Sequence, residues 1–283
     1  MVSARAVGFL REVLQPARLI EIFDIGANPV DGPPPYTALL ECDLARVTGF
    51  EPQPAAFAEL QKRQGASERY LPYAIGDGQE HELKICSGSG MTSLLEPDFH
   101  MLNHFEFLLP FAQVVTREQI STRRLDDIEE IEHLDYLKID IQGSELSVFQ
   151  NGREKLRNAV AIHTEVSFMP LYKDQPLFGQ VDVELRDQGF VPHRFAYIKN
   201  CIIAPTRING DPRQPLHQLL EADVVYVRDF TRPELMSDEQ LKQLCLIADL
   251  VYGSKDLTFR CMLLLEQRGA IAKNRCQKYF ENF

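Results

Sequence analysis

The sequence predicts an α/β fold built on a doubly wound, mostly parallel sheet. Short apolar segments alternate with helical ones over most of the chain, which is typical of parallel strands joined by crossover helices. The apolar run Ile22–Ile25 continues into the small-residue turn Gly26-Ala27-Asn28, and the run Val47–Phe50 ends at Glu51. A strand, a small-residue turn, a helix and a second strand ending in an acid form the arrangement with which such domains hold a nucleoside.

Each expected element follows from its apolar pattern. The expected strands are, in chain order, Leu19–Phe23, Arg46–Phe50, Arg69–Ile75, Glu82–Cys86, Gln113–Thr116, Tyr136–Ile139, Val160–Val166, Phe190–Tyr197 and Ala222–Val227. The expected helices among them are Tyr36–Cys42, Pro54–Lys62, Ser144–Phe149 and Gly179–Asp187. Pro54 suits a first helical turn, because the backbone N–H that it lacks would have no partner there. The apolar residues after it recur on one face of that helix.

The chain divides by pattern into a main part and a C-terminal part. We expect one domain over residues 1–230, opening with an amphipathic helix within residues 1–18, and a helical appendage over residues 231–283. In the appendage, Ser237 and Gln240 form a capping-box signature ahead of a helix with one apolar face. Gly253-Ser254 interrupts the pattern, and a second helix ends near Gly269. This C-terminal helical hairpin is too small to fold alone, and its apolar face could support a homodimer.

Composition and charge disfavour several classes of function. The chain has 283 residues, 45% of them hydrophobic, and no apolar run approaches the ~20 residues that a membrane span needs. Arg5 and Arg11 break the apolar N-terminal stretch, which argues against a signal peptide. The six cysteines include no C-x-x-C pair, so we expect reduced thiols in a cytoplasmic protein. A formal net charge of -11 argues against nucleic-acid binding.

The first turn and the acid at Glu51 indicate the kind of cofactor. Small residues let the backbone approach a ligand, and the two oxygens of a carboxylate can accept hydrogen bonds from both ribose hydroxyls. The turn after Asp24 is not G-x-G-x-x-G, and the chain contains no Walker P-loop, so neither a pyrophosphate nor a triphosphate is expected. A cofactor with a ribose and no phosphates fits better, and S-adenosylmethionine is one. An NAD-dependent oxidoreductase is the alternative that the missing glycines disfavour.

Candidate catalytic residues lie where two further strands end. Lys138 and Asp140 belong to a strand that turns into a helix at Gly143, and His163 and Glu165 share one face of the next strand. Reacting groups in such sheets gather at the carboxyl ends of the strands. Any of Asp140, His163 and Glu165 could remove a proton from an acceptor. Lys138 could instead pair with an acid, and His163 could equally be a buried core histidine.

No metal site is predicted. His100 and His104 are four residues apart, a spacing that can bind a metal, but no third ligand is near them in the sequence. Apolar neighbours favour a partly buried helix for this segment.

In several motifs, and in the order of these motifs along the chain, the sequence resembles the FkbM-type family of class I S-adenosylmethionine-dependent methyltransferases. These motifs span about residues 19–200, and the C-terminal hairpin lies outside them. The motifs are Phe23–Asn28, Gly49–Pro54, Tyr73–Asp77, Met91–Leu94, Arg124–Asp127, Leu137–Glu145 and His163–Val166. The resemblance implies a Rossmann-like methyltransferase fold and methyl transfer to an oxygen, often a hydroxyl of a carbohydrate or another natural product.

The resemblance also implies roles for individual residues. The methionyl part of the cofactor would contact Asp24, Gly26, Ala27 and Asn28. The ribose would be held by Glu51, followed by Pro52, and the adenine side would be bordered by Ala74, Ile75, Asp77 and Ser93. The acceptor would lie by Asp140 and Glu165.

Two departures from the family pattern stand out. Gln142 takes the place of a glutamate that is usual in the family, which disfavours assistance by Mg²⁺, because an amide is a poorer ligand for this ion than a carboxylate. The segment Pro29–Tyr36 is a longer, proline-rich loop where the family usually proceeds directly into a helix. Both departures keep a second hypothesis open, a catalytically idle cofactor-binding or scaffold protein with the same fold.

Overall fold

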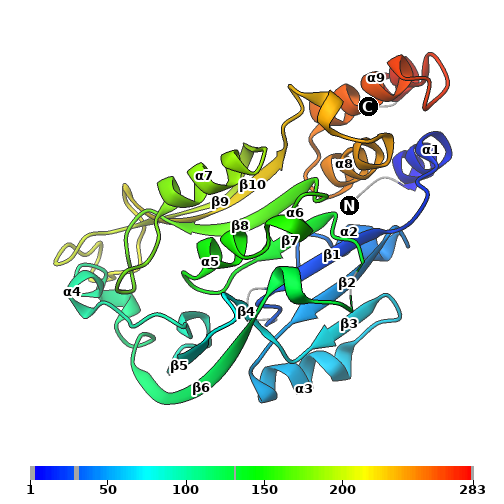
Figure 1. The fold of residues 1–283 in the computed structure, drawn as a ribbon. Helices are drawn as coiled ribbons and strands as arrows, with labels where there is room; N and C mark the ends of the chain where they lie inside the picture. The colour runs from blue at the N-terminus through cyan, green and yellow to red at the C-terminus, as the bar shows by residue number, and fades with distance from the viewer. Residues whose placement is uncertain (1–3, 29–31, 131, 282–283) are drawn as a thin grey trace.

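A computed structural model describes residues 4–28, 32–130 and 132–281, and its main sheet has seven strands. Figure 1 shows this sheet at the centre of the fold. The strand order is β3-β2-β1-β7-β8-β10-β9. The strands are β1 (Ile20–Ile25), β2 (Ala45–Phe50), β3 (Glu68–Leu71), β7 (Tyr136–Ile139), β8 (Ala161–Ser167), β9 (Phe190–Cys201) and β10 (Gln218–Arg228). The first five in spatial order are parallel, and β10 is antiparallel to both β8 and β9. The predicted α/β fold with a mostly parallel sheet is confirmed.

The strand order reverses between β1 and β7. From β1 the chain proceeds outward through β2 and β3, and it later returns beside β1 with β7 and continues to β8 on the other side. In open α/β sheets, ligands bind outside the carboxyl ends of the strands at such a switch point. The ends of β1 and β7 carry Asp24 and Lys138, which lie in register with each other.

A second sheet has three strands, in the order β4-β6-β5. Its strands are β4 (Ala74–Gly76), β5 (Glu80–Cys86) and β6 (Val114–Arg124). The single strand predicted over Arg69–Ile75 was wrong: Leu71 ends β3, and β4 begins after Pro72 and Tyr73 in the other sheet. Proline cannot donate to a strand ladder, which explains the break. The strand predicted over Gln113–Thr116 was too short, because most of β6 is exposed and lacks an apolar pattern.

One face of the main sheet is covered by helices from both ends of the chain. They are α1 (Ala4–Leu14), α2 (Thr37–Glu41), α8 (Asp238–Leu250), α9 (Lys255–Gln267) and α10 (Arg275–Phe280), and α10 was not predicted. Figure 1 shows α1 beside α8 above the sheet. Ile22, Val47 and Tyr136 of the sheet share one buried apolar cluster with Leu244 of α8 and Leu265 of α9. The C-terminal helices therefore complete the core on this face.

The opposite face carries a second buried cluster. Its helices are α5 (Glu145–Gln150), α6 (Arg153–Leu156) and α7 (Phe178–Asp187), while α3 (Pro54–Arg63) follows β2 and α4 (Phe99–Leu102) lies near β5 and β6. Phe23, Leu137 and Ile162 enter this second cluster, whereas their sequence neighbours enter the first. This alternation is the period of two that strands impose on their side chains.

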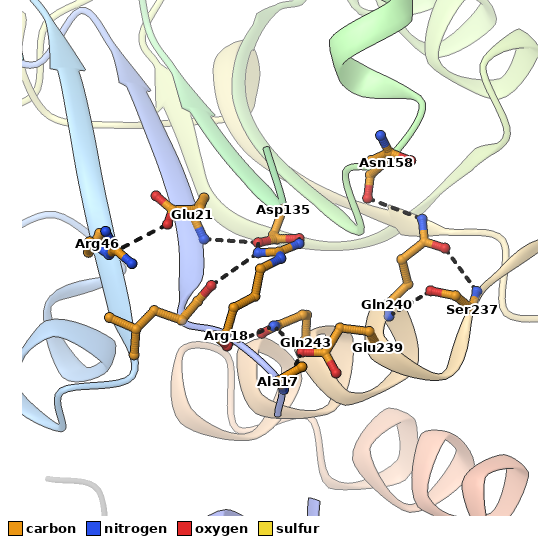
Figure 2. A network of polar contacts seen from close by, with 11 residues as sticks. Ala17, Arg18, Glu21, Arg46, Asp135, Asn158, Ser237, Glu239, Gln240 and Gln243 are labelled. Atoms are coloured by element: carbon orange, nitrogen blue, oxygen red, sulfur yellow. Dashed lines mark hydrogen bonds and ion pairs between the residues drawn. The ribbon is translucent and has the colours of Figure 1, made fainter. Parts of the chain in front are cut away.

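A polar network ties the segment before β1 to the sheet and to α8 (Figure 2). Arg18 forms a bidentate ion pair with the buried carboxylate of Asp135, and that carboxylate also accepts a hydrogen bond of 2.9 Å from the backbone N–H of Glu21. From α8, Gln243 donates to the carbonyl of Arg18 at 3.2 Å, and Glu239 accepts from the backbone N–H of Ala17 at 2.9 Å. The start of β1 and the C-terminal helices are thus fixed to each other.

Two further sequence expectations concern membranes and cysteines. No helix in the described ranges is long and apolar enough to cross a bilayer. All six cysteines are free thiols, and five of them are buried.

Candidate active site

A cavity of about 970 Å³ opens at the carboxyl ends of β1, β2, β7 and β8. This is the switch point of the sheet. Most residues expected in the site line this cavity: Asp24, Gly26, Ala27, Asn28, Glu51, Pro52, Ala74, Ile75, Ser93, Lys138, Asp140, His163 and Glu165. The part of the proline-rich loop formed by residues 29–31 lies outside the described residues.

Asp77 is placed elsewhere. It is absent from the described residues that line the cavity. Its carboxylate accepts from the backbone N–H of Gln79 at 2.9 Å, from Thr122 at 3.1 Å, and pairs with His81 at 2.8 Å. Asp77 therefore organises the turn between β4 and β5, and the structure does not bring it to the other expected cofactor residues.

Gly26 allows the two central loops to touch. Its φ is +77°, and a Cβ at this position would lie 1.9 Å from the backbone oxygen of Asp140. The backbone N–H groups of Gly26 and Ala27 both donate to the carbonyl of Phe50, at 3.1 and 3.2 Å. Only glycine can take this backbone conformation at such a close approach, so the floor of the cavity depends on it.

Asp24 is buried at the end of β1. Its Oδ2 accepts a hydrogen bond of 2.6 Å from the hydroxyl of Tyr36, and Lys138 Nζ lies 3.2 Å from Oδ1. The ammonium donates instead to the carbonyl of Gly26, and Oδ1 has no hydrogen-bond partner among the described groups. Burial alone would lower the pKa of Lys138, but the charges of Asp24 and Asp140 raise it above the usual range. Lys138 is thus a charged partner of Asp24.

Glu51 directly follows β2 and is only 2% exposed. Its Oε1 accepts from the backbone N–H of Gln53 at 2.8 Å, which fixes the group at the edge of the cavity. Burial raises the pKa of Glu51 to about 7. A buried carboxylate without a charged partner can gain much from two ligand hydroxyls.

The loop after β7 is held by Glu145, the first residue of α5. Its carboxylate accepts from the backbone N–H groups of Ile141 at 2.9 Å and Gly143 at 3.0 Å. Burial raises the pKa of Glu145 to about 7. Ser93 donates to the carbonyl of Gln142 at 2.7 Å, which joins the loop that contains Ser93 to this one. The loop is therefore ordered by the protein's own groups.

Gln142 joins two carboxylates inside the cavity. Its amide nitrogen donates to Asp140 Oδ1 at 2.9 Å and to Glu165 Oε2 at 3.1 Å, and its amide oxygen accepts from Tyr172 at 3.1 Å. Burial raises the pKa of Glu165 well above its ordinary value, and the charge of Asp140 raises it further. Carboxylate oxygens of Asp140, Glu145 and Glu165 lie within 4.8 Å of one another. The neutral amide of Gln142 therefore bridges two of these carboxyl groups.

The far side of the cavity is lined by β8, β9 and β10. His163 Nδ1 lies 3.1 Å from the hydroxyl of Tyr252, and its Nε2 lies 3.8 Å from Asp223 Oδ2. Lys199 pairs with Glu221 at 2.6 Å. This end holds several acids and a histidine, so it can exchange protons with a bound acceptor.

Comparison with protein families decides what kind of protein this is. A family model described as the methyltransferase FkbM domain matches residues 24–192. The chain belongs to the FkbM methyltransferase family. Membership confirms the predicted methyl donor, S-adenosylmethionine, as the cofactor. The cavity fits this group, since Glu51 offers a buried carboxylate and Asp24 Oδ1 lacks a hydrogen-bond partner among the described groups.

Individual relatives were also found. The 2-O-methyltransferase NoeI of Sinorhizobium fredii is 29% identical over 181 residues, which are 57% of this chain and 70% of the relative. Among solved structures, the magnesium protoporphyrin IX methyltransferase of Synechocystis superposes with a TM-score of 0.39 at 11% identity, covering 79% of this chain and 76% of that one. The precorrin-6y C5,15-methyltransferase of Geobacter metallireducens gives a TM-score of 0.39 at 8% identity, covering 81% and 90%.

Several cavity residues of this FkbM-family protein were missed by the sequence reasoning. They are Tyr36, Tyr197, Lys199, Glu221 and Asp223, which line the cavity, and Tyr252, which contacts His163. Glu221 and Asp223 carried a readable signal, because they are two acids at alternate positions within a largely apolar strand. Tyr252 carried none, since its contact with His163 joins residues far apart in the sequence. It also lies outside the matched range 24–192.

His100 and His104 do not join the cavity among the described residues. Both are exposed, with ring centroids 5.9 Å apart, and no third metal-ligating side chain groups with them in the described part of the chain.

Proposed function

We propose that this FkbM-family protein transfers a methyl group from S-adenosylmethionine to a hydroxyl of a carbohydrate or glycosylated natural product. One observation carries the proposal: a single cavity joins the buried Glu51 to a group of proton-exchanging side chains around His163 and Asp140. The relative NoeI is named a 2-O-methyltransferase, which supports oxygen as the methyl-accepting atom.

The cofactor end is assigned from the groups that line it. The carboxylate of Glu51 would accept from the ribose hydroxyls, and Asp24 Oδ1 would accept from the methionyl ammonium. The turn Gly26–Asn28 would lie along the methionyl chain. When bound, S-adenosylmethionine supplies an electrophilic methyl group on a sulfonium.

A sugar hydroxyl is a very weak acid, so a base must take its proton as the methyl group is transferred. We assign this role to His163. Burial raises the pKa of Glu165, and Glu165 and Asp140 both already accept hydrogen bonds from Gln142. His163 lines the cavity, and its Nε2 lies 3.8 Å from Asp223 Oδ2, beyond hydrogen-bond distance. Asp140 would orient the acceptor hydroxyl.

The test is a methyl-transfer assay with S-adenosylmethionine labelled in its methyl group and a panel of methyl glycosides and glycosylated metabolites. We expect label in an O-methyl product, identified by NMR. A His163→Gln variant should lose ~10²–10⁴-fold in turnover while it still binds the cofactor. Cofactor binding without transfer to any acceptor would support the idle-scaffold hypothesis, and equal turnover in the variant would remove His163 from the mechanism.

A further inference from the structure

We infer that Tyr197, on the edge strand β9, is the surface on which the sugar ring of the acceptor stacks, and that the acids beside it exclude an acidic sugar. The inference rests on the proposed function, because it concerns the acceptor of the methyl-transfer reaction. Strand β9 is the last strand of the main sheet, and Tyr197 lies outside the range that the family model matches. Residues beyond that range would therefore select the acceptor.

An exposed aromatic ring at the cavity is the first observation. Tyr197 lines the cavity, yet it is 56% exposed. The nearby Phe195 instead packs against Phe168 and Phe178, with ring centroids 6.4 and 6.1 Å away. Of the two aromatic residues on this part of β9, one contributes to packing and the other leaves its ring open to a bound molecule.

An irregularity in the strand ladder directs Tyr197 into the cavity. Residues two apart on a regular strand share one face. Here the register between β9 and β10 shifts, so that Tyr197 lies opposite Asp223 and Phe195 lies opposite the next residue, Val224. Asp223 lines the cavity, whereas Val224 belongs to the second buried cluster. The shift therefore turns Tyr197 away from the side of Phe195, as bulges beside active sites re-aim a side chain.

Three residues of this surface lie in one row across the sheet. Asp223 of β10 is in register with Glu165 of β8 on one side and with Tyr197 on the other. Adjacent strands are ~4.8 Å apart, so the backbones of Glu165 and Tyr197 are ~10 Å apart. His163 lies two residues before Glu165 on the same face of β8. A sugar ring over Asp223 would have Tyr197 on one side and the proton-exchanging groups on the other.

An aromatic face beside a carboxylate suits a pyranose. The face of an aromatic ring carries partial negative charge, and it attracts the C–H groups on one side of a sugar ring, which carry partial positive charge. The sugar hydroxyls at the rim of the same ring are donors, and a carboxylate such as that of Asp223 accepts strong hydrogen bonds from them. Tyr197 would thus fix the plane of the sugar, and Asp223 would fix its rotation in that plane.

The charge around Tyr197 is the basis for the second part of the inference. Lys199 lies on the same strand, but it pairs with Glu221 at 2.6 Å, so its charge is compensated. Asp223 has no lysine or arginine partner within the described ranges, and His163 Nε2 is 3.8 Å from it. A sugar with its own carboxylate would bring a like charge next to Asp223 and would be rejected.

A binding experiment tests the stacking directly. The chain contains no tryptophan, so Tyr197→Trp carries a single indole at the proposed position. With the demethylated cofactor present, we expect its emission to shift or be quenched on titration with the methyl glycoside that the wild type methylates best. Unchanged emission at concentrations that saturate methylation by the same variant would overturn the inference.

Phe280→Trp is the matched control for the titration. Phe280 is 58% exposed, close to the value for Tyr197, and the described residues that line the cavity do not include it. Its emission should stay constant over the same range of concentrations. An equal response of both variants would mean that the sugar does not bind specifically at Tyr197.

Kinetics separate stacking from a structural effect. Tyr197→Ala should raise the acceptor KM about tenfold with little change in kcat, as expected when a binding contact is lost. Tyr197→Phe, which keeps the ring, should restore most of this loss. Calorimetric titration should give both variants the wild-type affinity for S-adenosylmethionine, which shows that the cavity is intact. An acceptor KM in Tyr197→Ala equal to that of the wild type would overturn the stacking role.

Paired substrates test the exclusion of acidic sugars. The methyl glycoside that the wild type methylates best is compared with the methyl uronide of the same sugar, which carries a carboxylate at C6. The uronide should have at least about tenfold lower kcat/KM, and Asp223→Asn should narrow the difference. Equal use of both sugars by the wild type would overturn this part of the inference.

The two proposals fail in different ways. Absence of cofactor binding and methyl transfer in the wild type would contradict the proposed function. Methylation of a sugar by the wild type together with an unchanged acceptor KM in Tyr197→Ala would contradict the stacking role alone.

Discussion

At the residue scale, Glu51 is a binding group whose burial destabilises the folded protein. Its carboxylate is almost fully buried, and its hydrogen bond to Gln53 does not replace the water that it loses. The raised pKa of about 7 expresses this cost. When an acid has a higher pKa in the folded protein than in the unfolded chain, its ionisation opposes folding. The protein therefore loses stability as the pH rises from the pKa of the unfolded state through that of the folded state. Above pH 7 the ionised group opposes folding and is ready to accept hydrogen bonds.

Glu51→Gln should therefore change stability and binding in opposite directions. Without ligand, the variant should be more stable than the wild type at pH 8 by about 1–3 kcal/mol, and the difference should close toward pH 4.5. Its affinity for S-adenosylmethionine should fall at least about tenfold, because an amide cannot accept from two hydroxyls as a carboxylate does. Urea unfolding and calorimetric titration measure the two effects.

A matched control is Glu59→Gln on the exposed face of α3, where the acid pairs with Lys62. It should leave the affinity unchanged. The wild-type affinity should itself weaken as the pH falls below 7, since Glu51 must then release a proton to bind. Equal affinity of wild type and Glu51→Gln at pH 8 would contradict the ribose assignment.

The sequence predicted the residues of the site better than their partners. Asp24 and Glu51 follow apolar runs directly, so their place at the cavity could be predicted from the chain alone. Asp77 was expected beside the adenine, but it does not line the cavity among the described residues. Thr122 of β6 and His81 bind its carboxylate instead. These contacts depend on the register of the small sheet, which no local pattern specifies.

At the scale of elements, the crossing of the β1 and β7 loops is the tightest constraint. Gly26→Ala should strongly destabilise the protein, because the added Cβ would collide with the backbone of Asp140 at a positive φ. We expect a loss of several kcal/mol, or failure to accumulate as folded protein.

Gly179→Ala is the control for this prediction. Gly179 lies in α7, and a Cβ there would meet no atom within 4 Å. Alanine also favours a helix over glycine, so this variant should be neutral or more stable by up to ~1 kcal/mol. Thermal unfolding of both variants decides the matter: similar melting temperatures would show that the two loops are not in contact.

Elements were predictable where burial was one-sided or complete. The bounds of β7 coincide with the predicted Tyr136–Ile139, because its apolar run is short and sharply bounded. Only the first residues of the exposed β6 were predicted as a strand. The helix α10 was not predicted, since Arg275–Phe280 is too short to show a helical period of apolar residues. Packing against α9 stabilises α10 in the fold, and the sequence of α10 alone does not indicate this contact.

At the scale of the whole molecule, the C-terminal helices and the sheet share one core. Leu244 and Cys261 belong to the same buried cluster as Ile22 and Tyr136. We predict that α8 and β7 unfold together. Native-state hydrogen exchange should give amides of the two elements the same free energy of opening. Lower protection throughout α8 would instead indicate an appendage that opens independently of residues 1–230.

The central claim is that the cavity binds S-adenosylmethionine through Glu51. The most direct measurement is calorimetric titration of the protein and its Glu51→Ala variant with S-adenosylmethionine and with the demethylated product, with and without Mg²⁺. We predict micromolar binding by the wild type, with the product bound at least as tightly, and a large loss in the variant. Absence of binding to either compound, or equal binding by the variant, would contradict the account.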